Sequence, residues 1–227
     1  MTLLLARIPA LRLVRTPRAW IPIAAWTLLA IVIALSSRAR GATTGADHVM
    51  RGAFAFFVLP LVAYGVVGAT LGSAGLRGGI RGVVALGAAP RRAALASVLV
   101  AITTSAALCG VLAALVCALA HGSQDPPLAV DMAASLGVAA LGGAAYAAFF
   151  SVGAAIGRGT MRSVFLALDW ILGGGAGAGA LFMPRGHVTS LLGGPLCADL
   201  SQRASSLMLV VLLLAYAGLA VLLVRRA

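Results

Sequence analysis

The side chains of this sequence that could do acid–base, nucleophilic or metal chemistry are few and scattered. The three histidines are His48, His121 and His187, and they lie far apart along the chain. No HExxH pair occurs, and no group of histidine, cysteine and aspartate has the spacing of metal ligands. We therefore expect no catalytic constellation, no metal site and no cofactor bound by this chain.

Asp169 is the one ionisable residue well inside an apolar segment. An aspartate near the middle of a membrane costs about 2.5–3.5 kcal/mol on insertion scales, so such residues usually face a bundle interior or a watery cavity. Two interpretations follow. Asp169 could contact a substrate or ion in a pathway, or it could make a structural hydrogen bond to a neighbouring helix.

A cluster of glycines, "GGGAGAG" at 173–179, follows Asp169 and raises the question of phosphate binding. Gly175, Gly177 and Ala180 fit a loose dinucleotide fingerprint, but that fingerprint needs a preceding strand. Here the flanks form one apolar segment, 163–183, and the chain has no lysine for a Walker A loop. The GxxxG spacing instead predicts close helix packing, or a bendable hinge. The glycines with this spacing are Gly68, Gly72, Gly153, Gly157, Gly173, Gly175, Gly177 and Gly179.

The composition places these residues in a membrane protein. Of the 227 residues, 62% are hydrophobic and 10% charged, and the mean hydropathy is +1.07. Soluble domains carry about 25% charged residues. A spanning helix needs about 17–25 mostly apolar residues. Six segments qualify, at 20–36, 53–75, 93–120, 132–156, 163–183 and 206–224. We predict an all-α polytopic fold of six transmembrane helices in one domain, 1–227.

The distribution of arginine predicts the orientation. All 17 basic residues are arginines. With a cytoplasmic N-terminus, twelve of them fall inside and five outside, as the positive-inside rule favours. We therefore expect both termini in the cytoplasm. The net charge of +12 does not indicate nucleic-acid binding, because the arginines separate hydrophobic segments. A cleaved secretory signal is the alternative for the N-terminus, but its apolar run of 17 residues exceeds the usual 7–15.

Two further stretches could contact other molecules. The aromatic group "FAFF", Phe54 to Phe57, begins the second segment at its outer end. It fits an interfacial aromatic belt or a contact surface for an amphiphilic substrate. The loop 76–92 is too apolar for a solvated loop, and "GIRGVVALG" predicts a short helix that Gly87 ends. Its residues available to a partner are Arg77, Ile80, Arg81, Val83, Val84 and Leu86. The alternative is a helix lying among anionic lipid headgroups.

Three stretches resemble the type-2 ATP-binding-cassette (ABC) permeases, the six-span membrane half of many bacterial exporters. They are the basic N-terminal segment "LARIPALRLVRTPRAW" at 5–20, "LGAAPRR" at 86–92 and "HVTSLLGGPLCADL" at 187–200. The first belongs to a cytoplasmic segment, 1–19. The second is similar to the pattern after the family's coupling helix, and the third to the re-entrant element in an outer loop, 184–205. One departure is that "GSAGLRGGI" at 72–80 has no acidic residue.

The resemblance implies a half-transporter in the bacterial inner membrane. Two copies would pair, and two separate ATPase subunits, which hold ATP and Mg, would dock on the cytoplasmic coupling loop 76–92. In the family the first, second and fifth spans line the pathway, which makes Trp26, Phe57 and Asp169 candidate lining residues. The cargo would be a lipid, peptide, drug or similar amphiphile. The alternatives are an ATP-independent secondary exporter or channel, and a membrane scaffold subunit of another complex.

Overall fold

A computed structural model describes residues 2–15, 17–157, 159–174 and 177–224. Every regular element within these ranges is helical, and they contain no strand, so the predicted all-α fold is confirmed. The elements are α1 Thr2–Arg15, α2 Pro17–Ala39, α3 Gly45–Val49, η1 Met50–Val58, α4 Leu59–Leu71, α5 Gly75–Ala85, α6 Pro90–Ala120, α7 Leu128–Ile156, α8 Met161–Leu172, η2 Ala178–Phe182, α9 Pro184–Leu191, η3 Cys197–Asp199 and α10 Gln202–Leu223.

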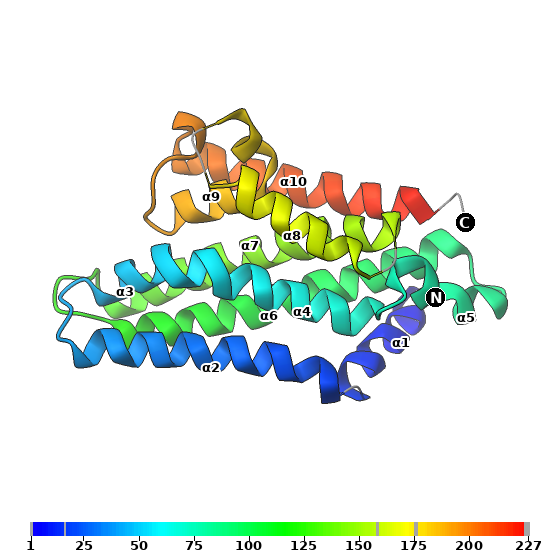
Figure 1. The fold of residues 1–227 in the computed structure, drawn as a ribbon, viewed down its shortest axis with the longest axis horizontal. Helices are drawn as coiled ribbons and strands as arrows, with labels where there is room; N and C mark the ends of the chain where they lie inside the picture. The colour runs from blue at the N-terminus through cyan, green and yellow to red at the C-terminus, as the bar shows by residue number, and fades with distance from the viewer. Residues whose placement is uncertain (1, 16, 158, 175–176, 225–227) are drawn as a thin grey trace.

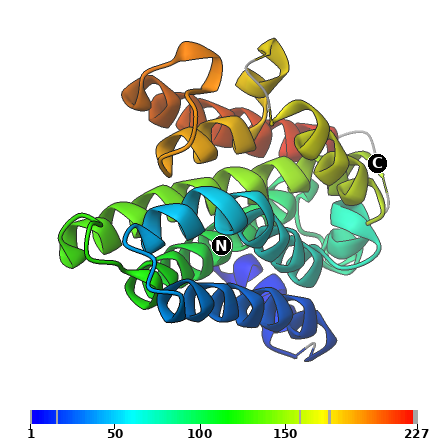
Figure 2. The same ribbon diagram turned by 60° about the vertical axis from the view of Figure 1, so that its left-hand side comes forward.

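The long helices run side by side in one bundle. Figure 1 shows α2 along one side and α10 along the opposite side, with α6 and α7 between them, and Figure 2 shows the same order. The buried part of α7 consists largely of alanine and glycine from Ala139 to Ala155. Small side chains let helix backbones approach closely in a membrane. The centre of the bundle is therefore built from small residues, with larger side chains filling the gaps.

Five apolar stretches of the described chain are long enough to cross a membrane. They are Trp20–Ala39, Gly45–Ala85, Pro90–Ala120, Leu128–Ile156 and Gln202–Leu223. An all-helical chain with these stretches is consistent with the prediction of a helical membrane protein. The number of crossings and the side on which the termini lie stay predictions.

The prediction of one continuous helix over 163–183 is wrong. Helix α8 ends at Leu172, where the Gly173 amide donates the last helical hydrogen bond to Asp169 O at 2.8 Å. The chain continues as a 3-10 turn, η2, and a new helix, α9. Glycine is about 1 kcal/mol less favourable than alanine in a helix. Five glycines within 173–179 therefore end α8 instead of extending it.

Helix α5 and its ends confirm the short helix predicted in the loop 76–92. Gly87 has φ +89° and follows the helix, and Ala88 N donates to Val83 O at 3.2 Å. This left-handed turn closes the helix as a glycine C-cap does. Helix α6 then begins at Pro90. Figure 1 shows α5 at the end of the bundle where α1 begins and α10 ends.

Candidate functional site

The main opening that involves predicted site residues is a groove beside α4, which we call the α4 groove. It has a volume of about 920 Å³ and lies between α4, the start of α2, the first turn of α8, and the α1 and α5 helices. Its lining residues are Arg12, Pro22, Trp26, Leu61, Tyr64, Gly65, Gly68, Ala69, Leu71, Gly72, Ser73, Ala74, Gly78, Gly79 and Arg162. Of these residues, the sequence predicts Trp26, Gly68 and Gly72 as candidate site residues.

Arg162 is a buried cation in the wall of this groove. Its side chain is 7% exposed. The Nε atom donates to Gly159 O at 3.0 Å, and the guanidinium carbon lies 5.2 Å from the centroid of the Tyr64 ring. Tyr64 is held in turn by a hydrogen bond of 2.8 Å between its hydroxyl and Ser163 Oγ. The sequence marked Arg162 only as a charge on the cytoplasmic side, because a single arginine at a helix start has no further signature.

The three predicted pathway residues do not meet at one place. Trp26 lines the α4 groove, whereas neither Phe57 nor Asp169 does. Phe57 belongs to an exposed aromatic cluster in which its ring centroid lies 4.4 Å from that of Phe56 and 6.0 Å from that of Trp170. Asp169 is the neighbour of Trp170 on α8, but its side chain turns inward and is fully buried.

Asp169 joins three elements inside the bundle. Its carboxylate accepts a hydrogen bond of 2.9 Å from the Tyr146 hydroxyl on α7 and one of 3.3 Å from the Arg185 amide on α9. Tyr146 is fully buried and stacks on Phe150, with ring centroids 5.7 Å apart. This geometry matches the structural interpretation of Asp169, in which its carboxylate ties α8 to its neighbours. Tyr146 and Arg185 carried no signal in the sequence, since their partner is distant along the chain.

The glycines predicted to pack helices or to bend have different surroundings. Gly153 of α7 lies against α8, because a Cβ added there would be 3.2 Å from Met161 O and from Arg162 Cα. A Cβ on Gly157, just after α7, would meet the Met161 side chain at 2.6 Å. On Gly68 the nearest atom would be Arg162 Nη1, at 2.7 Å. Gly153 and Gly68 therefore both make room for the first turn of α8.

Among the described residues, the remaining glycines of this set do not form helix-packing pairs. Gly72 caps the end of α4 with φ +80° and so cannot pair with Gly68 along one helix. Gly173 and Gly177 lie beyond the end of α8, and Gly179 belongs to the 3-10 turn η2. Gly175 lies outside the described residues. The predicted GxxxG packing of the fifth span is therefore wrong for the described members, because the helix that would carry it ends at Leu172.

The predicted docking residues of α5 fall into buried and exposed groups. Ile80 is 5% exposed and packs in the core, so its expected availability to a partner is wrong. Val83 and Val84 are half-buried against the same core. Leu86 is 89% exposed and Arg81 is also exposed. Ile80 is covered because it faces α1, where Leu5 and Ile8 line a small cavity with it.

Two grooves adjoin α5, and Arg77 and Arg81 line both of them. One groove, of about 560 Å³, also has Ile156 and Gly157 in its wall. The other, of about 610 Å³, includes Val84, Pro90 and Val224. The Arg77 Nη2 atom donates to Leu223 O at 3.0 Å, which fixes α5 against the end of α10. The exposed part of α5 is thus basic and apolar at once.

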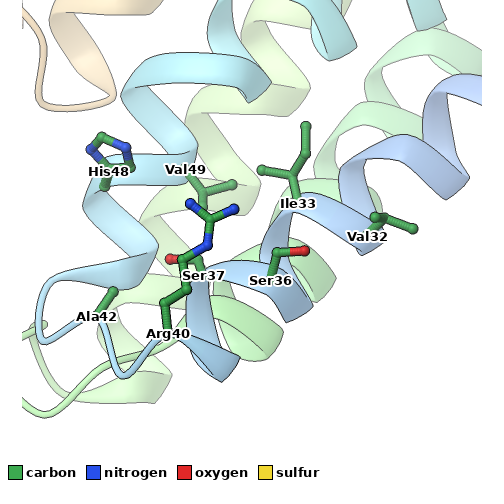
Figure 3. A pocket seen from close by; sticks show the side chains of 8 residues that line it. All are labelled: Val32, Ile33, Ser36, Ser37, Arg40, Ala42, His48 and Val49. Atoms are coloured by element: carbon green, nitrogen blue, oxygen red, sulfur yellow. The ribbon is translucent and has the colours of Figure 1, made fainter.

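A further pocket, of about 340 Å³, lies at the opposite end of α2. Figure 3 shows its lining, with Val32, Ile33, Ser36 and Ser37 on α2, Arg40 and Ala42 in the following turn, and His48 and Val49 on α3. His48 is the only titratable group there besides Arg40. Within the described part of the chain, no group of three His, Cys, Asp or Glu residues could hold a metal ion.

Comparison with protein-family models, with curated proteins and with solved structures finds no match to this chain.

Proposed function

We propose that the chain is the membrane-spanning permease subunit of an ABC exporter in the bacterial inner membrane. Two copies pair, and two separate ATPase subunits bind ATP and Mg and dock on α5. The chain itself is a transport subunit and not an enzyme. Its cargo is an amphiphile, such as a lipid, peptide or drug, that moves through a pathway beside α4 and between the paired copies.

The observation that supports this proposal best is the attachment of α5. Leu76 and Ile80 of α5 are buried in the core, while Arg81 of the helix and Leu86, the residue that follows it, are exposed. Only residues 72–74 separate α5 from α4, and Pro90 begins α6 four residues after Leu86. A partner that binds the exposed side of α5 therefore transmits its motion directly to α4 and α6. Such an arrangement is well suited to convert the motion of an ATPase into a tilt of the bundle.

The α4 groove and the charge distribution also fit this proposal. The groove exposes Trp26, a residue that the family resemblance assigned to the pathway. Arg12, Arg77 and Arg81 lie near the end of the bundle that α5 occupies, which the positive-inside rule would place in the cytoplasm. An ATPase can reach α5 only from that side. Both features would be incidental in a scaffold subunit.

The proposal is tested by changing the exposed end of α5. Purified with the candidate ATPase from a neighbouring gene, the Leu86→Asp variant should lose the partner, because a carboxylate replaces the highly exposed leucine that directly follows α5. The matched control is Leu196→Asp, since Leu196 is an exposed leucine before η3, away from α5. Equal recovery of the ATPase with both variants, or no ATPase partner at all, would contradict the proposal.

A further inference from the structure

We propose that the α4 groove binds an anionic amphiphile, with Arg162 and Arg12 holding the charged headgroup and Trp26 contacting the apolar part. The proposal that the groove binds such a ligand rests on its own geometry. The additional statement that this ligand is the cargo rests on the export function proposed above.

The first argument is that Arg162 is a buried cation without an anionic partner. Its Nε atom donates to Gly159 O, but its Nη1 atom is buried against Gly68 with no hydrogen-bond partner. Among the described residues, no aspartate lines the groove. A buried charge is unfavourable unless it is paired and hydrogen-bonded. Arg162 therefore carries a positive charge that no aspartate of the described groove lining offsets, and an anion from outside the chain can lie beside it in the groove.

The second argument is that a second arginine lines the groove, so that two positive charges face it. Arg12 lines it from α1, and its Nη1 atom lies 3.2 Å from the Cβ position of Gly79 on α5. Arginine binds phosphate and carboxylate oxygens with a planar fork of donors, often through two hydrogen bonds at once. Two arginines on the wall of one groove therefore favour a phosphate or carboxylate headgroup over a zwitterionic or neutral one.

The third argument is that the groove changes from charged to apolar along its length. Gly72, which caps α4, and Gly79 of α5 lie near the arginine end of the groove, whereas Leu61 is about three turns earlier on α4. Trp26 and Pro22 of α2 and Leu61 and Gly65 of α4 give this second part an apolar wall. A volume of about 920 Å³ suits a ligand of drug size or one lipid chain. A headgroup at the arginines thus leaves room for a tail beside Trp26.

Trp26 provides a direct probe of this ligand. In a variant with Trp20→Phe and Trp170→Phe, Trp26 is the only tryptophan. This variant is placed in lipid nanodiscs that contain a small fraction of brominated phosphatidylglycerol or brominated phosphatidylcholine. Bromine quenches tryptophan fluorescence at short range. We expect phosphatidylglycerol to reach half-quenching at a lower mole fraction than phosphatidylcholine, by about fivefold for each arginine that holds the headgroup.

Three variants in this background identify the cation. Arg162→Gln should reduce the preference for phosphatidylglycerol about fivefold, because Arg12 remains, whereas Arg162→Lys, which keeps the charge, should retain most of it. Arg92→Gln is the matched control, because Arg92 is an exposed arginine at the start of α6, outside the groove. An equal loss in Arg92→Gln would show general attraction of a basic protein for anionic lipid and would overturn the proposal. If Arg162→Gln does not fold, Arg12→Gln tests the same groove.

Two other outcomes also overturn the proposal. If low-millimolar inorganic phosphate removes the preference, the groove binds a small anion and not an amphiphile. If neither brominated lipid quenches Trp26 while the sample is dimeric, a second copy of the chain covers the groove. The measurement contains no ATPase, so it separates the two proposals. A clear lipid preference in a chain that recruits no ATPase would support the binding site and contradict the exporter.

Discussion

The guanidinium carbon of Arg185 lies 3.6 Å from the centroid of the Phe56 ring. The same side chain donates from Nη2 to Phe56 O at 3.0 Å. These contacts join α9 to the π-helical segment η1, 129 residues earlier in the chain. Arg185 is 2% exposed, and its backbone amide also donates to Asp169. One residue of the predicted outer loop therefore connects η1, α8 and α9.

The substitution Arg185→Gln should destabilise the protein by about 2 kcal/mol, the sum expected for one cation–π contact and one charged hydrogen bond. The lower stability would appear as a reduced midpoint of thermal unfolding in detergent. Arg203→Gln is the control, because Arg203 is an exposed arginine at the start of α10. Equal midpoints for the two variants would mean that the cost of burying the guanidinium cancels its contacts.

The substitution Tyr146→Phe should cost roughly 1–3 kcal/mol, since it leaves one oxygen of the buried Asp169 carboxylate without its donor. Asp169→Asn should cost less, because its amide oxygen can still accept one of the two hydrogen bonds. A double-mutant cycle of the two changes measures the coupling. Stability changes that simply add would show that Tyr146 and Asp169 do not interact.

Transport distinguishes the structural interpretation of Asp169 from the functional one. In liposomes that contain the chain and its ATPase, Asp169→Asn should keep ATP-driven export, because the carboxylate is enclosed by Tyr146 and Arg185 and lines no part of the α4 groove. Export would be measured as loss of a labelled amphiphile from the vesicles. Transport by this chain alone under a proton gradient, abolished in the variant, would instead support a secondary exporter.

Two glycines of α7 should respond oppositely to alanine. At Gly153 a new Cβ would lie 3.2 Å from backbone atoms of α8, so Gly153→Ala should push α8 away and lower the unfolding midpoint. At Gly137 nothing lies within 4 Å, so Gly137→Ala should stabilise the helix by up to about 1 kcal/mol. A fall in stability for both would indicate that helix contact does not decide the effect.

The thiol of Cys197, between α9 and α10, should react slowly with maleimide at neutral pH. Burial raises its pKa, because the thiolate loses hydration in the apolar surroundings of this loop. The thiolate is the reactive form, so at a given pH the folded protein holds less of it than the unfolded chain. In a Cys109→Ala, Cys117→Ala background, the rate of maleimide labelling of the folded protein should still rise at a pH where the labelling rate of the unfolded chain has reached its plateau. Identical rate profiles for folded and unfolded protein would refute this.

Several features of this protein follow from local sequence. The apolar runs and the paucity of charges predict an all-helical membrane protein, and the all-helical structure with its long apolar helices agrees with this prediction. The ends of α5 were also predictable, because Gly87 and Pro90 act within a few residues of themselves. A glycine with positive φ closes a helix, and a proline opens the next, whatever lies around them.

The tertiary structure decided what depends on neighbours far along the chain. Hydropathy predicts one span over 163–183. In the structure the glycines after Leu172 end α8, and the chain turns back so that Arg185 of α9 contacts Asp169. From the local sequence, Ile80 is expected to be available to a partner, but α1 covers it in the structure. From sequence, Arg162 is expected to be a charge at the surface. In the structure it is buried, because α4 lies against it at Gly68. Local sequence sets the helices and their ends, whereas the burial of a side chain depends on which distant helices pack around it.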